Sequence, residues 1–421
     1  MSLNVESTVD TGLRLNRKTG QLEALLAQSP MFDAVIEEID GRQIRIGDHW
    51  LADFASCNYL GFDLDPQIID SVDREVRRWG THPSWSRMLG NPRLYIDIED
   101  RLTDLLGAPD VLVLPTITHI HLTVLPVLAA GGWIFVDGQA HRTVYDGCKA
   151  AAASGATLRR YPANDLAELE RLLRLAPPSV PKVICTDGVN SMTGNVCDLT
   201  ALAALARAHD ALLYVDDAHG FGVLGERSAD ELCSYGARGN SVVRHVGESY
   251  DNLVLVGGFS KAYSSLLAFL ALPTALKDRL KVEASPYLYS GPSPIASLAT
   301  TIAGFDVNEE RGDEIRADLH QKTAMVLTAL SRLDIYSRNT SGLPIIEIPL
   351  ANAEDLPAVG RFLFKHGIYV TLASYPLVPL SDVGFRIQLT AANTMAEIEH
   401  LITTLGLLAD QFPMQSAHSA R

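Results

Sequence analysis

Three reactive side chains follow two apolar stretches in the middle of the chain. Asp216 and His219 come directly after Leu212–Val215, and Lys261 comes shortly after Leu253–Gly258. Short apolar runs that end in turn residues are typical of buried strands, and open α/β sheets place their sites at the carboxyl ends of strands. An amine at such a position can attack a carbonyl carbon and form an imine. A carboxylate and an imidazole beside it suit a pyridine cofactor held through that imine.

The elements around these residues are predicted to alternate between strand and helix. The predicted strands are Val111–Leu114, Trp133–Val136, Val183–Thr186 and Leu212–Val215. The predicted helices are Pro66–Trp79, Tyr95–Leu106, Thr116–Leu128, Ala163–Leu175 and Leu199–His209. This alternation is the signature of a parallel, doubly wound sheet. We therefore predict a large α/β domain over residues 56–294, preceded by an N-terminal arm and linker over residues 1–55.

The pattern changes after Pro294. Two long helices are predicted at Ile295–Val307 and Glu314–Leu333, and a last helix at Met395–Leu408. Short strands between them are predicted at Ile345–Ile348, Tyr369–Leu372 and Gly384–Leu389. We predict a smaller C-terminal α+β domain over residues 295–410 and a disordered tail over residues 411–421.

Composition limits the classes of protein that fit. The 421 residues are 47% hydrophobic and 20% charged, which is typical of a globular protein, and the net charge of −15 argues against nucleic-acid binding. The five cysteines are widely spaced without a CxxC pair, which favours reduced thiols in the cytoplasm and no metal site. The uncharged stretch Val111–Val136 is long enough to cross a bilayer, but its prolines and glycines favour strand, helix and strand. No signal peptide and no membrane span are predicted.

The order of short motifs along most of the chain resembles the α-oxoamine synthases, a branch of the pyridoxal-phosphate (PLP) enzymes with the aspartate-aminotransferase fold. The motifs are Asn58–Gly61, Ser86–Arg87, Ala140–His141, Thr186–Val189 with Ser191–Met192, Val215–Gly220, Ser260–Ala262, Pro286–Ser290 and Arg386–Gln388. The resemblance implies PLP fold type I, with a mostly parallel seven-stranded sheet in the large domain. It also implies a homodimer with active sites shared between subunits.

The resemblance further implies roles around the cofactor ring. Lys261 is the imine partner and proton carrier, and Asp216 keeps the pyridine nitrogen protonated, so that the ring accepts electrons. His219 and Ser191 lie near the phenolic oxygen, and His141 stacks on the ring. The plainer interpretations stay open: Lys261 as a surface lysine, and His141 as a histidine of a turn.

The implied phosphate and substrate sites involve other segments. Asn58 and Arg386 match the pair that holds the amino-acid carboxylate, although Arg386 can also be read as a surface arginine on an edge strand. The phosphate is expected at Ile117 and Thr118, with help from Ser260 and from Ser290 of the neighbouring subunit.

The chain departs from its relatives at the phosphate site. No aromatic residue occurs in Pro115–His119, and Gly258 stands where relatives have a threonine. The side chains of Trp85, His119 and His121 are expected to line an acyl channel, although core packing explains Trp85 nearly as well.

The reaction implied is a decarboxylative Claisen condensation of an amino acid with an acyl thioester, either acyl-CoA or an acyl-carrier protein. It yields an α-amino ketone, CO2 and free thiol. Two alternatives remain: an aminotransferase or carbon–carbon lyase of the same fold, and a catalytically silent binding subunit.

Overall fold

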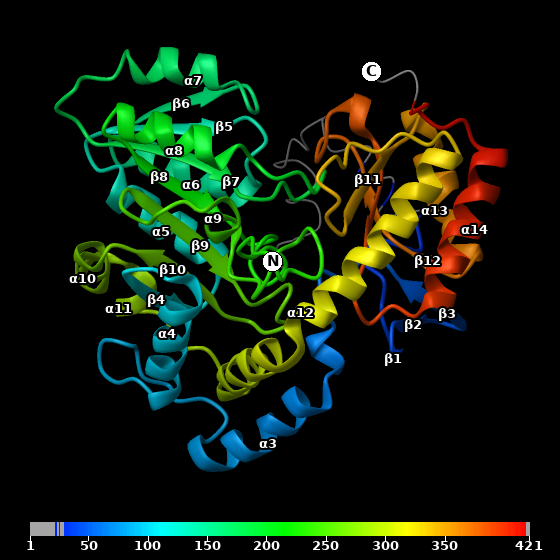
Figure 1. Cartoon of the computed structure of the whole chain (residues 1–421), viewed down its shortest axis with the longest axis horizontal. Helices are drawn as coiled ribbons and strands as arrows, with labels where there is room; N and C mark the ends of the chain where they lie inside the picture. Colours follow the sequence, from blue (N-terminus) through cyan, green and yellow to red (C-terminus); the bar gives the residue numbers. More distant parts are fainter. Residues whose placement is uncertain (1–21, 23–24, 26–28, 418–421) are drawn as a thin grey trace, which may run out of the picture.

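The computed structural model of the chain describes residues 22, 25 and 29–417 (Figure 1). The sequence also predicts a short helical fragment at Gln21–Leu26, which lies mostly outside the described residues. No helix among the described residues is long and apolar enough to cross a membrane. The uncharged stretch over residues 111–136 forms strand, helix and strand, as expected.

A seven-stranded sheet forms the centre of the large domain. Its strands, in spatial order, are β4 (Asp110–Leu114), β10 (Ala268–Leu272), β9 (Leu253–Gly258), β8 (Leu212–Asp216), β7 (Lys182–Asp187), β5 (Trp133–Asp137) and β6 (Thr157–Tyr161). Strand β10 runs antiparallel to both of its neighbours, β4 and β9, and the other pairs in this sheet are parallel. The predicted fold, a mostly parallel seven-stranded sheet, is confirmed. Strands β6 and β10 had not been predicted.

Helices cover both faces of this sheet (Figure 1). The core on one face takes its helical residues from α5 (Ile117–Leu128), α6 (Arg142–Ala153), α10 (Thr274–Glu283) and α11 (Ser285–Leu288). The core on the other face takes them from α4 (Arg93–Leu106), α7 (Leu166–Leu173), α8 (Leu199–Ala208), α9 (Val242–Val246) and α12 (Ile295–Arg332), and α3 (Pro66–Trp79) packs against α12. Alternate residues of one strand enter opposite cores, as with Leu213 and Tyr214 of β8, because successive side chains of a strand point to opposite faces.

One helix replaces the two predicted after Pro294. Helix α12 (Ile295–Arg332) is continuous over 38 residues and runs from the large sheet to the C-terminal part (Figure 1). The gap between the two predicted helices, residues 308–313, is helical because polar groups on its buried side are hydrogen-bonded. The guanidinium of the fully buried Arg316 donates to the side chain of the buried Asn308 and to the Gly222 carbonyl, whereas Glu309 and Glu310 are exposed.

The C-terminal part contains a three-stranded antiparallel sheet in the order β11 (Ile345–Pro349), β14 (Gly384–Gln388) and β13 (Thr371–Ala373). Helices α13 (Leu356–Lys365) and α14 (Met395–Gln411) accompany it. A second sheet joins β1 (Glu38–Asp40), β2 (Gln43–Ile46) and β3 (His49–Asp53) to β12 (Ile368–Tyr369).

The two ends of the described chain are more ordered than predicted. Residues 38–53, expected within an arm and linker, are strands that pair with the C-terminal part through β3 and β12. The tail predicted as disordered over 411–421 forms bridges at Met414 and Ser416, and residues 418–421 lie outside the described part. The boundaries between domains stay predictions.

Candidate active site

A cavity of about 340 Å³ opens at the carboxyl ends of the strands in the large sheet. Eight residues predicted to form the site line it: Ile117, Thr118, His141, Ser191, Asp216, His219, Ser260 and Lys261. Residues that had not been predicted as part of the site also line it, among them Thr143, Asp187 and Leu266. Residues predicted from separate parts of the chain thus line one cavity, and their roles stay predictions.

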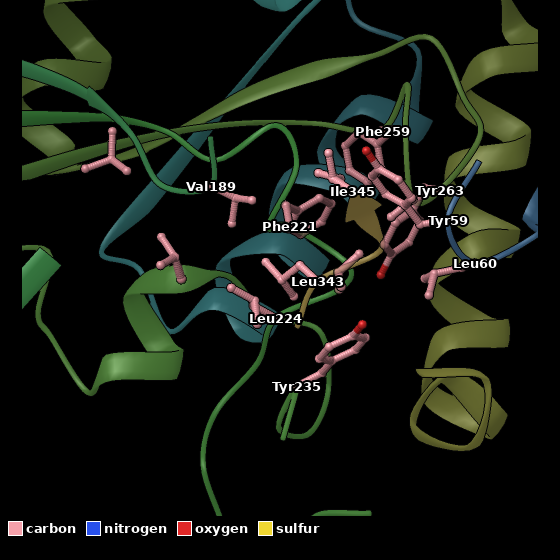
Figure 2. Close-up of a cluster of buried hydrophobic side chains, with 14 of the residues drawn as sticks. Tyr59, Leu60, Val189, Phe221, Leu224, Tyr235, Phe259, Tyr263, Leu343 and Ile345 are labelled. Carbon is pink, nitrogen blue, oxygen red and sulfur yellow. The ribbon is translucent and has the colours of Figure 1, made fainter. Parts of the chain in front are cut away.

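Lys261 lies on a loop that buried aromatic rings hold in place. Phe259 and Tyr263, two residues to either side of the lysine, are fully buried and pack with centroids 5.3 Å apart. Phe221 follows the β8 end and stacks on Tyr263, with ring centroids 5.2 Å apart (Figure 2). The loop that carries His219 and the loop that carries Lys261 thus share one aromatic cluster, which restricts how far the two side chains can separate.

Asp216 belongs to a buried hydrogen-bonded chain. His121 bonds through Nε2 to Asp216 Oδ2 at 2.9 Å and through Nδ1 to the Tyr214 hydroxyl at 2.8 Å. Burial raises the pKa of Asp216, but the opposing effects of His121 and Lys261 are stronger and lower that pKa to about 2. Asp216 is therefore ionised at neutral pH, and Nε2 of His121 must donate to it.

The expectation that His121 lines an acyl channel is wrong. Its side chain is 0% exposed and lies between Tyr214 and Asp216, because the α5 position four residues after Ile117 faces β8. The sequence contains no signal that pairs His121 with Asp216, since 95 residues separate them. The roles expected for His119 and Trp85 stay predictions.

His219 is held by a tyrosine from the Asn58–Gly61 motif. Its Nδ1 lies 2.7 Å from the hydroxyl of Tyr59, and both side chains are buried. Burial, with Lys261 and Arg386, lowers the pKa of His219 well below its usual value, and burial raises the pKa of Tyr59. A neutral ring that accepts from Tyr59 at Nδ1 carries its one proton on Nε2.

His141 is the N-cap residue of α6 and lines the cavity. Its backbone N–H donates to the carboxylate of Asp187, and its Nδ1 lies 2.8 Å from Thr143 Oγ1. Burial, together with the nearby Lys261, lowers the pKa of His141 and favours an uncharged ring. The backbone bond to Asp187 ties the start of α6 to the end of β7.

The amino terminus of α5 faces the cavity. Thr116 caps this helix by accepting from the His119 backbone N–H, and the backbone N–H groups of a first helical turn favour anions. A Cβ atom built on Gly258 would lie 2.5 Å from Cδ1 of Ile117. The two departures from the relatives, a non-aromatic residue at the start of α5 and Gly258 in place of threonine, are therefore in contact. Ile117 fills the space that a side chain at position 258 would occupy.

Three predicted residues do not line this cavity. Arg386 lies beside it and donates from Nη1 to the carbonyl of Ser191. Asn58 donates to Asp63. Ser290 lies beyond α11 on the surface, and its expected role in a neighbouring subunit stays a prediction.

Comparisons with known proteins agree with this geometry. Residues 51–405 match the family model for aminotransferase class I and II. The chain belongs to the aminotransferase class I and II family. An 8-amino-7-oxononanoate synthase from Chromohalobacter salexigens is 35% identical over 355 residues, covering 84% of this chain and 88% of that protein. One from Methylobacillus flagellatus is 30% identical over 378 residues, covering 89% and 91%.

Solved structures show the same fold. A serine palmitoyltransferase from S. paucimobilis, with PLP and myriocin bound, has a TM-score of 0.85 at 22% identity and covers 94% of this chain and 99% of its own. An 8-amino-7-oxononanoate synthase from Francisella tularensis has a TM-score of 0.70 at 23% identity, covering 86% and 98%. Together with the sequence relatives, these confirm the predicted α-oxoamine synthase branch.

The residues present fit the cofactor of this family. The amine of Lys261 suits the aldehyde carbon of PLP, and the ionised carboxylate of Asp216 suits its protonated ring nitrogen. The amino terminus of α5 suits its phosphate. The cofactor is PLP, and the protein is a PLP-dependent acyltransferase. The predicted reaction, decarboxylative condensation of an amino acid with an acyl thioester, is confirmed as that of the α-oxoamine synthase branch.

Proposed function

We propose that this chain condenses an amino acid with an acyl thioester in the cavity around Lys261, with the residue roles set out below. The observation that carries the proposal is that one cavity joins Lys261, an ionised Asp216 and a neutral His219. Bound PLP supplies an electron sink for the negative charge that develops on the substrate carbon. The Lys261 amine anchors the cofactor and carries protons at the same carbon.

The buried polar groups keep each side chain in one protonation state. Asp216, fixed by His121, holds a negative charge for the pyridine nitrogen. His219 presents Nε2–H to the phenolic oxygen because Tyr59 occupies Nδ1. His141 covers one face of the ring. The amino terminus of α5 holds the phosphate with Ile117, Thr118 and Ser260.

The substrate carboxylate is proposed to bind Arg386, with Asn58 nearby. A guanidinium binds a planar carboxylate through two parallel hydrogen bonds. Nη1 of Arg386 is held by the carbonyl of Ser191, which orients the group beside the cavity. Ser191 itself lines the cavity, so the clamp and the cofactor site are contiguous.

We also propose a homodimer with shared sites in the cytoplasm. Large apolar side chains near the cavity and the Pro286–Ser290 segment are exposed, including Leu89 at 74%, Leu266 at 56% and Tyr289 at 80%. Contact with a second copy would remove this apolar surface from water. All five cysteines are free thiols, which fits a reducing compartment.

The test is release of free thiol when the holoenzyme receives acyl-CoA and an amino acid. Thiol release that requires both substrates supports the proposal. Amino transfer or carbon–carbon cleavage without thiol release would show another reaction on the same fold. The variant Lys261→Ala should lose the visible absorption band of the lysine-bound cofactor and all activity, while the exposed Lys365→Ala should keep both. A chain without that band from the start would be a silent binding subunit.

A further inference from the structure

Glu347 is a buried acid beside the proposed carboxylate clamp. It lies directly opposite Arg386 in the antiparallel pairing of β11 with β14, and it is 1% exposed. Residues that face each other in such a pair point to the same side of the sheet, with Cβ atoms about 4.5–5.5 Å apart. That side of the sheet faces the site, since Arg386 reaches Ser191 from it. The acid and the guanidinium are therefore neighbours next to the cavity.

Hydrogen bonding in this pair is incomplete. Oε2 of Glu347 and Nε of Arg386 are both buried and have no hydrogen-bond partner among the described residues. The other arginine near Glu347 is Arg338, which is already bound to both carboxylate oxygens of Asp382. Arg386 forms no ion pair among the described residues, so it is the nearby cation whose charge is not already offset by a carboxylate, although Arg338 acts more strongly on Glu347. A buried carboxylate without compensation is costly.

The surroundings bring Glu347 close to a change of charge at neutral pH. Burial raises the pKa of Glu347 to about 7, with Asp382 acting in the same direction and Arg338 and Arg386 opposing it. On the other side of Arg386, strand β13 places the uncharged Thr371 directly opposite it, so this strand brings no further charge to the pair. A substrate carboxylate on Arg386 would add a second anion that competes for the same cation. A nearby negative charge favours the neutral form of a carboxyl group.

We propose that Glu347 is a proton-linked positioning residue of the clamp, which balances Arg386 in the free enzyme and takes up one proton when a substrate carboxylate binds there. The inference rests on the proposed role of Arg386. At low pH, Glu347 is already neutral, so Arg386 is free for the substrate. At high pH, the substrate must displace an ionic neighbour. Binding therefore weakens as the pH rises through neutrality.

The test compares two probes that differ by one carboxylate. The holoenzyme is titrated spectroscopically with L-alanine and with ethylamine between pH 6 and 8.5, and the ratio of their Kd values is followed. Protonation of the amine affects both probes alike in this range, so the ratio isolates the carboxylate. In the wild type, the preference for L-alanine should fall by up to about tenfold per pH unit above neutrality, as expected for one linked proton.

Two variants distinguish proton-linked binding at Glu347 from a general effect of a substitution on the fold. Glu347→Gln keeps the shape but cannot titrate, so its ratio should stay constant with pH at the value of the wild type at low pH. Glu354→Gln makes the same change at an exposed position of the C-terminal part and should behave as the wild type does. An unchanged absorption spectrum in both variants shows that the cofactor site is intact.

Either of two results would overturn the inference: a ratio that does not vary with pH in the wild type, or the same variation in Glu347→Gln. Equal binding of L-alanine and ethylamine at every pH would show that Arg386 does not bind the substrate carboxylate. It would then also rule out the proton-linked role of Glu347. The thiol-release assay is independent of this ratio. A protein that releases thiol but shows no pH-dependent ratio therefore keeps its proposed reaction and loses only the role of Glu347.

Discussion

At the residue scale, we predict that Tyr59 donates to Nδ1 of His219 and so selects Nε2 as the nitrogen that carries the proton. Its hydroxyl lies 2.7 Å from Nδ1, and burial keeps the phenol protonated by raising its pKa. The variant Tyr59→Phe removes this partner and lets the proton occupy either nitrogen. A neutral hydrogen bond contributes about 0.5–1.5 kcal/mol, so kcat/KM should fall by roughly two- to tenfold.

Nitrogen chemical shifts of His219 provide the measurement that a purely structural role of Tyr59 would leave unchanged. The shifts should move from a single Nε2–H tautomer to a mixture of both tautomers in Tyr59→Phe. The variant Tyr161→Phe removes a buried hydroxyl that has no hydrogen-bond partner among the described residues, so it serves as the matched control and should change neither the shifts nor the cofactor spectrum. A single Nε2–H tautomer in Tyr59→Phe would show that another group selects it.

Protonation of the buried Asp217 carboxyl group makes the stability of the folded protein depend on pH. Asp217 is 0% exposed, its Oδ1 has no partner, and burial raises its pKa to about 8. In the unfolded chain the pKa of this group returns to its ordinary value of 3.8, so the folded state binds more protons between pH 3.8 and pH 8. The stability contributed by the protonated group is fully present below about pH 4 and is lost as the pH rises towards 8.

The variant Asp217→Asn cannot titrate and should escape this loss. Its free energy of unfolding relative to the wild type should therefore increase from pH 4 to pH 8, by about 1 kcal/mol per pH unit at most, and then level off. Denaturation at several pH values measures the difference. The exposed Asp70→Asn should give a difference that does not change with pH. A constant difference for Asp217→Asn would mean that Asp217 is ionised in the folded protein.

At the element scale, the end of β9 and the start of α5 pack through Gly258 and Ile117. The variant Gly258→Ala places a Cβ 2.5 Å from Ile117 Cδ1, so it should destabilise the protein by about 1–3 kcal/mol. Adding Ile117→Ala opens the space, so the double variant should lose less stability than the sum of the two single changes. Additive losses from chemical denaturation would argue against this contact as the cause.

At the scale of the whole molecule, shared active sites predict complementation between inactive variants. Lys261→Ala removes the amine of its own site, and Ser290→Asp should repel the phosphate of the neighbouring site. A mixed dimer contains one site with both residues intact, so mixing and reassociating the variants should restore about a quarter of the wild-type activity. Sedimentation checks that dimers form. Absence of any recovery in confirmed mixed dimers would place Ser290 outside the neighbour's site.

Much of the architecture followed from local patterns. Apolar runs that end in Asp216 and near Lys261 predicted both strands and the edge where the site lies, because carboxyl ends of parallel strands converge. Helix α3 was predicted with its observed bounds, since its apolar residues recur at helical spacing and Gly80 follows its last residue. The family motifs added the cofactor, which the comparisons confirm.

Only the tertiary structure decided which polar residues meet. His121 pairs with Asp216 across 95 residues, Tyr59 with His219 across 160, and Glu347 faces Arg386 through strand register. The centre of α12 was misread for the same reason, since the buried guanidinium of Arg316 donates from Nη1 to the distant carbonyl of Gly222. The sequence by itself determined most of the helices and strands between residues 66 and 216, because these depend on local spacing, but it missed β6, β10 and the strands of residues 38–53. Partners of buried polar groups depend on contacts between distant segments, which local spacing does not encode.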